Sequence, residues 1–211
     1  MIFCRKKKIP QRTLDEIKNI CNIVFVDDKS FPIIDTLKSS GWRNIQKLKD
    51  VESIDQKEIR EAHIIFMDIQ GVGKKMKLPN EGLDLIVAIK TKYPNKKIIA
   101  YSAEDQGKVA AFHKGIDLAD SRLSKNAIAY EFQFRLENFS KQIFSLEECV
   151  ERIKSILIQE LGYTPQTEKI ISSLEKMNYN DSITTGVVTK HFNIQNAANL
   201  ASIIQLFLKG N

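Results

Sequence analysis

Five polar residues stand where short apolar segments of the sequence end, and together they could transfer a phosphoryl group. They are Asp27, Asp28, Asp68, Ser102 and Lys125. Three carboxylates held close together repel one another and need a cation to remain ionised. Hard carboxylate oxygens without a soft ligand nearby favour Mg²⁺ over zinc, and a carboxylate beside Mg²⁺ can attack a phosphoryl group and hold it as an acyl phosphate. An ammonium and a hydroxyl could then bind the phosphoryl oxygens, where negative charge gathers.

The segments before these residues read as buried strands that alternate with helices, which predicts a five-stranded parallel, doubly wound α/β sheet with helices on both faces. Ligands of such sheets bind beyond the carboxyl ends of the strands. A single aspartate there is most simply a solvated turn residue, but five suitable residues in order favour a site. The expected strands are Ile23–Val26, Asn44–Leu48, His63–Met67, Lys97–Tyr101 and Ala119–Leu123, and the expected helices are Phe31–Ser40, Asp55–Glu61, Leu83–Lys92, Glu104–His113 and a helical region from Ala127 onward.

Residues of about 22–143 resemble the receiver domains of two-component response regulators, which have a flavodoxin-like sheet. The resemblance is carried by short motifs spread along this region. They are Val26-Asp27-Asp28, Ile64-Ile65-Phe66-Met67-Asp68, the turn Pro79-Asn80-Glu81-Gly82-Leu83-Asp84-Leu85, Ile98-Ile99-Ala100-Tyr101-Ser102-Ala103 and Leu123-Ser124-Lys125.

The resemblance assigns a role to each polar residue of the predicted site. Asp68 would be the phosphoacceptor, and it would hold Mg²⁺ together with Asp27, Asp28 and the backbone carbonyl of Gln70. The phosphoryl donor in such systems is a phosphohistidine of a sensor histidine kinase or of a phosphotransfer protein.

Two further roles follow from the same resemblance. Ser102 and Lys125 would contact the phosphoryl group, and Gln70 and Glu104 occupy places that resemble the family's tuners of phosphoryl lifetime.

Three features depart from the family pattern. The segment after Asp68 is longer than usual and carries Lys74, Lys75 and Lys77, which we interpret as an ordinary mobile surface loop that could alternatively attract an anionic partner. Asn126 follows the lysine where the family has a proline, often in a cis peptide. A cis bond without proline costs about 3 kcal/mol, so this turn is expected to be trans and shifted. Arg122 replaces the family's switching aromatic residue, which predicts a modified relay.

Composition and charge limit the remaining possibilities. The 211 residues are 43% hydrophobic and carry a net charge of +6, which is typical of a globular protein. Residues 1–21 carry a net charge of +4 and are assigned to a basic arm. No apolar run approaches the ~20 residues of a membrane span. The three cysteines are scattered, without a disulfide or zinc pattern, so a cytoplasmic location is expected.

The receiver region is expected to be followed by a small all-α domain at residues 144–211. Residues 127–161 could form one continuous helix with a surface for a homodimer, or two helices that are separated by the capping box at Ser145. Thr164-Pro165 predicts a helix start. Residues 145–211 contain six basic and seven acidic residues, and this balance favours protein docking over DNA binding.

The sequence therefore predicts a response regulator, a phosphoprotein of a phosphorelay that signals through its helical domain to a protein. Three alternatives stay open: a phosphorylation-controlled DNA-binding regulator, a receiver fold used only for protein binding, and an Mg²⁺-dependent phosphohydrolase or phosphotransferase. Enzymes of the last kind commonly place a second acid two residues beyond the nucleophile. Gln70 stands there, so a true enzyme is not expected, and self-dephosphorylation should be slow.

Overall fold

A computed structural model describes residues 12–103 and 113–145 of the chain, together with isolated residues between 148 and 169. Residues 14–141 form one compact unit, and the remaining residues cluster separately. Most of the predicted helix Glu104–His113, the possible tuner Glu104 and nearly all of the predicted helical domain lie outside the described residues.

The compact unit is built around a parallel sheet in which every strand is short and largely apolar. The strand order is β2-β1-β3-β4-β5, and each adjacent pair is parallel. This is the flavodoxin-like order, and it confirms the predicted fold class. The strands are β1 Ile23–Val26, β2 Ile45–Leu48, β3 Ile64–Asp68, β4 Lys97–Ser102 and β5 Ser121–Ser124.

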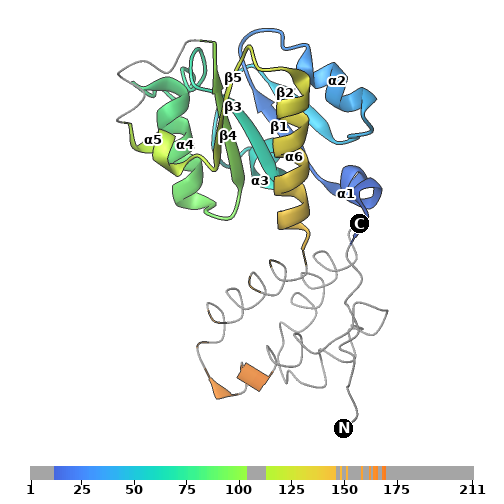
Figure 1. Cartoon of the computed structure of the whole chain (residues 1–211). Helices are drawn as coiled ribbons and strands as arrows, with labels where there is room; N and C mark the ends of the chain where they lie inside the picture. Colours follow the sequence, from blue (N-terminus) through green and yellow to red (C-terminus); the bar gives the residue numbers. More distant parts are fainter. Residues whose placement is uncertain are drawn as a thin grey trace. The chain divides into compact units, whose positions relative to one another are not determined.

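Helices cover both faces of this sheet, with α4 and α5 on one side and α2 and α6 on the other (Figure 1). Crossover connections through helices are what parallel neighbouring strands require. The helices are α1 Leu14–Ile20, α2 Ile33–Ser39, α3 Lys57–Glu61, α4 Glu81–Lys92, α5 Lys114–Leu118 and α6 Ala129–Ile143.

Successive side chains of the central strands point to opposite faces of the sheet and join two different cores, one aliphatic and one aromatic. Val24 and Val26 of β1 join an aliphatic cluster that includes Ile59 of α3 and Ile86 of α4. Phe25 points to the other face and stacks on Phe66 of β3, with ring centroids 4.3 Å apart. This face is aromatic, and α2 and α6 pack on it.

The compact unit begins earlier than residue 22. Residues 14–20, which we assigned to the basic arm, form α1, and Ile17 is buried, as is Cys21 directly after the helix. Burial of apolar side chains stabilises this segment against the sheet rather than leaving it in solvent. Residues 1–11 lie outside the described part of the chain.

Gly115 lies inside α5, close to α4. The His113 side chain caps the first turn of α5 by accepting a hydrogen bond from the Gly115 N–H at 3.0 Å. A Cβ at Gly115 would overlap the carbonyl oxygen of Leu83. The glycine therefore allows α5 to approach α4 closely.

The loop between β3 and α4 is anchored to the compact unit, contrary to our interpretation of it as a mobile surface loop. Val72 is fully buried in the aliphatic core. The Asp50 carboxylate accepts hydrogen bonds from the backbone N–H groups of Gly73 and, at 2.9 Å, Lys75. Lys75 also forms an ion pair with Glu52. The Lys75 ammonium is therefore paired with an acid of the same compact unit.

The described residues after α6 favour two helices over one. The helix ends at Ile143, and the Ser145 hydroxyl accepts a hydrogen bond from the Glu148 N–H at 3.2 Å, as a capping box does. Further on, Pro165 is helical, and the Glu168 N–H donates to the Thr164 carbonyl at 3.0 Å. These contacts confirm the predicted helix start at Thr164.

Candidate functional site

The register of the sheet brings the predicted site residues to one edge. Val26 of β1 lies beside Met67 of β3, so Asp27 follows at the level of Asp68. Asp68 in turn lies beside Tyr101 of β4. Because all strands run the same way, the polar residues at their carboxyl ends meet at the same rim, as the sequence predicts.

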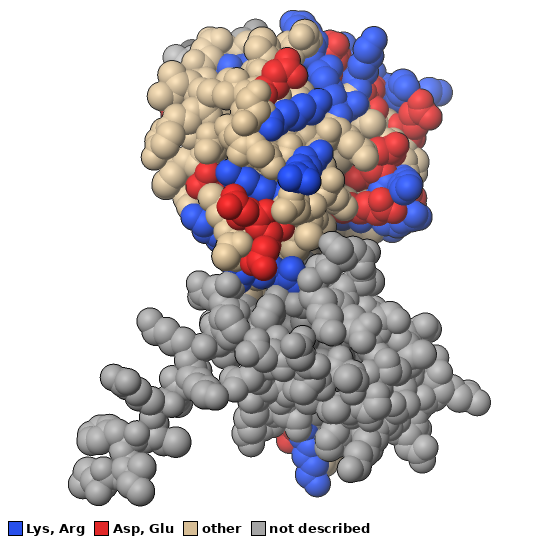
Figure 2. Space-filling model, turned by 90° about the vertical axis from the view of Figure 1, so that its right-hand side faces the viewer, with Lys and Arg blue, Asp and Glu red and all other residues tan. Residues whose placement is uncertain are grey.

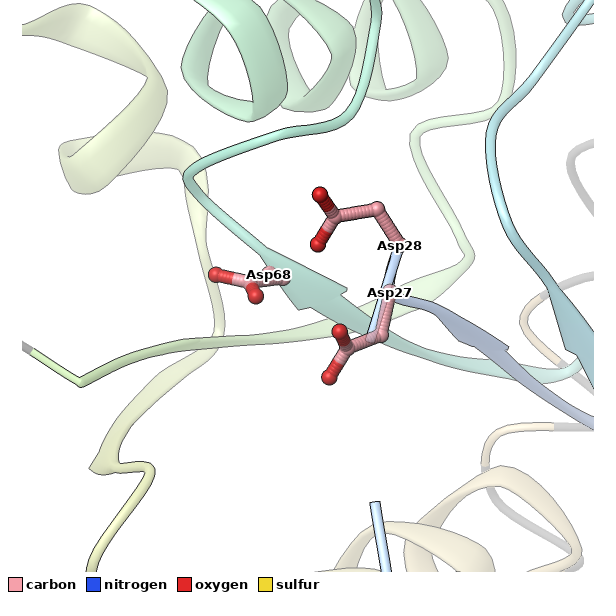
Figure 3. Close-up of side chains that lie close together, drawn as sticks. All are labelled: Asp27, Asp28 and Asp68. Atoms are coloured by element: carbon pink, nitrogen blue, oxygen red, sulfur yellow. The ribbon is translucent and has the colours of Figure 1, made fainter. Parts of the chain in front are cut away.

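The three aspartates form one cluster, with Asp27 and Asp28 extending from the end of β1 and Asp68 from the end of β3 (Figure 3). A carboxylate oxygen from each lies within 4.8 Å of the others. Asp27 is fully buried, Asp68 is nearly so, and Asp28 is exposed. The cluster is thus open to solvent mainly on the side of Asp28.

Lys125 reaches into the cluster and contacts two of its members. Its Nζ lies 2.8 Å from Asp27 Oδ2 and 2.7 Å from Asp68 Oδ2. The two hydrogen bonds offset the repulsion between the buried carboxylates. The ammonium also lies 5.6 Å from the ring centroids of Phe31 and Tyr101, which stabilise it as a cation.

Burial changes the protonation equilibria of this pair in a specific direction. Burial raises the pKa of Asp68 above its ordinary value, and hydrogen bonds from Lys125 and from the Gln70 N–H offset only part of that effect. Partial burial alone would lower the pKa of Lys125, but its hydrogen bonds to Asp27 and Asp68 outweigh this and raise it. The ammonium therefore stays protonated, whereas the ionised form of Asp68 is less favourable in the folded protein than in water.

The surroundings of Asp28 fit a divalent cation bound by oxygen atoms. Gly71, with φ of +83°, lies so close that a Cβ there would be 2.6 Å from Asp28 Oδ2. The Gly71 N–H donates to Glu81 Oε2 at 2.6 Å, which fixes the turn after Asp68. The carboxylate oxygens that Asp27, Asp28 and Asp68 place within 4.8 Å of one another are the kind of ligands that suit Mg²⁺.

Gln70 lies in the turn where the resemblance requires a carbonyl ligand. Its N–H donates to Asp68 Oδ1 at 3.2 Å, and its side chain is exposed. The use of its carbonyl as a metal ligand stays a prediction.

Ser102 and Lys125 lie together at the ends of β4 and β5. The Lys125 N–H donates to the Ser102 carbonyl at 2.6 Å, and Ser102 is almost fully buried. The described residues contain no cis peptide bond, so the bond before Asn126 is trans, as expected. Lys125 nevertheless reaches the carboxylates.

Arg122, which replaces the family's aromatic residue, points to the α5 side of β5. Its Nη2 donates to the carbonyl of Ile116 at 3.0 Å and lies 3.4 Å from Asp117 Oδ1. The guanidinium is thus attached to α5 rather than lying among the aspartates.

Sequence reasoning missed two side chains that contact Asp27. Tyr101 donates its hydroxyl to Asp27 Oδ2 at 2.9 Å, and Lys47 donates its ammonium to the Asp27 carbonyl at 2.7 Å. The only available signal for Tyr101 was its hydroxyl group, which stands near the end of a strand whose preceding residues Ile98, Ile99 and Ala100 are aliphatic. Lys47 gave no signal, because an exposed lysine in a short strand such as β2 is ordinary.

On the face that lies to the right in Figure 1, acidic and basic side chains are interspersed beside an area that carries few charges (Figure 2). Within residues 12–103 and 113–145, no helix combines the length and the apolar character that a membrane span requires.

Comparisons with known proteins give structural matches alone. No family model and no curated protein matches the chain. The receiver domain of NtrX from Brucella abortus is 22% identical, with a TM-score of 0.46 over 57% of this chain and 98% of that one. TrrA from Thermotoga maritima, in complex with Mg²⁺-BeF, is 20% identical, with a TM-score of 0.45 over 57% and 99%. RcsB from Salmonella enterica, bound to promoter rprA, is 18% identical, with a TM-score of 0.44 over 89% and 99%.

The matched NtrX structure is a receiver domain and the matched TrrA structure is a response regulator protein, the class that the sequence motifs resemble. At such identities the similarity concerns the fold. The strand order of the sheet independently gives the same fold, because 2-1-3-4-5 is the flavodoxin-like order that receiver domains share. The compact unit therefore has a flavodoxin-like fold, and its acidic cluster lies at the carboxyl ends of the strands, where such sheets bind ligands.

Proposed function

We propose that this protein is a response regulator that accepts a phosphoryl group on Asp68. The observation that carries the proposal is the joint placement of three carboxylates within 4.8 Å and a lysine ammonium that bridges two of them. A structural ion pair needs one acid for one base. Here, a third carboxylate faces solvent at the same point, which favours a site for a cation and an anionic ligand.

The chemistry follows from the roles of the chain's own groups. A carboxylate oxygen of Asp68 attacks the phosphorus of a phosphohistidine, the P–N bond breaks, its electron pair stays on the imidazole, and an acyl phosphate forms on Asp68. The Lys125 ammonium exchanges its contact with the Asp68 carboxylate for a contact with the phosphoryl oxygens, and the Ser102 hydroxyl donates to the same oxygens. Mg²⁺, held by Asp27, Asp28, Asp68 and the Gln70 carbonyl, would neutralise charge on the phosphoryl group.

The partners and the output follow from the same proposal. The donor is a sensor histidine kinase or a phosphotransfer protein, and residues 144–211 carry the signal to a downstream protein, with a homodimer as a further option. The net charge of −1 over residues 145–211 supports a protein target over DNA. Gln70 in place of a second acid supports a phosphoacceptor that loses its phosphoryl group slowly, rather than an enzyme with turnover.

The test is the intact mass of the full chain after incubation with acetyl phosphate and Mg²⁺. One added phosphoryl group is expected on the native chain and on Asp35→Asn, which changes an exposed aspartate of α2. No adduct is expected on Asp68→Asn or without Mg²⁺. An unmodified native chain, or an equal adduct on Asp68→Asn, would refute the proposal.

A receiver fold that only binds protein is the second candidate, and the contacts of Arg122 favour it. In place of a mobile aromatic ring, β5 carries a guanidinium that is bonded to the Ile116 carbonyl of α5. Absence of both a phosphoryl adduct and beryllofluoride binding would support this candidate.

A further inference from the structure

Asp27 receives more hydrogen bonds than an ion pair requires. Its Oδ1 accepts from the Lys29 N–H at 2.8 Å. Its Oδ2 accepts from Lys125 Nζ at 2.8 Å and from the Tyr101 hydroxyl at 2.9 Å. Both oxygens of this fully buried carboxylate are therefore bonded to protein donors.

Tyr101 is held rigidly with its hydroxyl at Asp27. Its ring is fully buried, stacks on Phe31 with centroids 5.0 Å apart, and meets Phe132 of α6 edge-on at 6.0 Å. The phenolic hydroxyl lies 2.9 Å from Asp27 Oδ2. Because an ionised carboxylate only accepts hydrogen bonds, the hydroxyl is the donor.

Packing accounts for the ring but not for the hydroxyl. A phenylalanine could make the same stacking and edge contacts with Phe31 and Phe132. The hydroxyl adds a buried polar group that must find an acceptor, and its acceptor is a member of the acidic cluster. A donor at this oxygen draws negative charge away from the space that Asp28 and Asp68 face.

We infer that Tyr101 is a positioning residue of the metal site: its hydroxyl holds Asp27 toward Lys125 and thereby weakens the attraction of the cluster for a divalent cation. The inference rests on the proposed function only in that the site binds such a cation. It concerns the strength of cation binding and does not require phosphoryl transfer. Removing the hydroxyl should leave more charge on Asp27 and tighten cation binding.

The test uses Mn²⁺ as the probe and counts free Mn²⁺ by electron paramagnetic resonance during titration of the full chain. Tyr101→Phe is expected to bind Mn²⁺ about three-fold more tightly, or more, since a hydrogen bond to a charged group is removed. Tyr101→Met, which also lacks the hydroxyl, should shift the affinity in the same direction. The matched control is Tyr93→Phe, which removes a hydroxyl bonded to Asp55 at 2.8 Å on the surface and should leave the affinity unchanged.

A role in the fold alone would give a different pattern. It predicts a lower unfolding temperature with equal or weaker Mn²⁺ binding. In an Asp27→Asn background, the tightening caused by Tyr101→Phe should disappear, because the charge that the hydroxyl offsets is absent. Unchanged or weaker binding in both Tyr101 variants, while the native chain binds Mn²⁺, would overturn this inference alone. A native chain that binds no Mn²⁺ would overturn the inference and the metal site of the proposed function together.

Discussion

The ammonium of Lys125 lies 2.7 Å from Asp68 Oδ2, although Asn126 follows the lysine in place of the proline usual in receiver domains. The expected shift of this turn does not carry the lysine out of reach. The Lys125 N–H donates to the Ser102 carbonyl at 2.6 Å and so fixes the start of the turn against β4. The β4–β5 pairing, rather than a proline, places the lysine.

Lys125→Met should weaken both the fold and the site. Its Nζ offsets the charges of Asp27 and Asp68, so removing it leaves two carboxylates uncompensated in a buried cluster. The free energy of unfolding is expected to fall by about 3 kcal/mol at pH 7, measured by urea denaturation without Mg²⁺. Lys38→Met, at an exposed position of α2, is the control and should cost less than about 0.5 kcal/mol. Equal losses in the two variants would contradict the bridging role.

The raised pKa of Asp68 predicts a pH dependence of stability with a definite sign. The native state binds the Asp68 proton at a higher pH than the unfolded chain does. Stability from this group therefore falls as the pH rises from the ordinary carboxyl pKa through the raised folded pKa. Without Mg²⁺, Asp68→Asn should be more stable than the native protein at pH 7, and the difference should vanish in acid. Thermal unfolding across pH tests this, with Asp35→Asn as the control; an Asp68→Asn variant that is less stable than the native protein at pH 7 would show that the pKa is lowered instead.

The placement of the three aspartates could be predicted because each depends on one local pattern. Asp27, Asp28 and Asp68 follow apolar runs that must be buried strands, and parallel strands place such residues at one rim. Ser102 and Lys125 are positioned by the same rule. No knowledge of distant contacts was needed for this part of the site.

The Tyr101–Asp27 hydrogen bond could not be predicted in this way. It requires the β3–β4 register, which sets Tyr101 beside Asp68, and the packing of Phe31 and Phe132, which orients the ring. The anchoring of the β3–α4 loop likewise depends on Asp50, which is distant in sequence and reads as an ordinary turn residue. A single-sequence pattern contains no record of such long-range pairs.

Gly71→Ala should damage the site more than a left-handed backbone alone explains. The added Cβ would lie 2.6 Å from Asp28 Oδ2, in addition to the strain of φ +83°. We expect Mn²⁺ binding to weaken at least about ten-fold, because Asp28 would have to move away from the cation. Gly41→Ala is the matched control, because Gly41 has φ of +95° but meets only Lys18, whose Cδ lies at 3.5 Å. It should reduce stability by about 1 kcal/mol and keep its Mn²⁺ affinity. Similar Mn²⁺ affinities in both variants would mean that Asp28 is not held against Gly71.

A phosphoryl mimic should be sensed at Arg122 through a route that differs from an aromatic switch. Ser102 and Ser124 are partners in the β4–β5 pairing, so movement of Ser102 toward the phosphoryl oxygens displaces the end of β5. Arg122, two residues earlier on that strand, is bonded to Ile116 and Asp117 of α5, and it would transmit the displacement to that helix. Beryllofluoride with Mg²⁺ should therefore shift the amide NMR signals of Ser102, Arg122 and Ile116.

The matched variant for this experiment is Arg122→Gln, which removes the charge and shortens the reach to α5. It should keep the shift at Ser102 and abolish most of the shift at Ile116, because β5 still responds but is no longer bonded to the helix. Asp68→Asn should abolish all of the shifts. If beryllofluoride binds and leaves Ser102 and Arg122 unchanged, the modified relay is wrong, and α5 would have to receive the signal by another path or not at all.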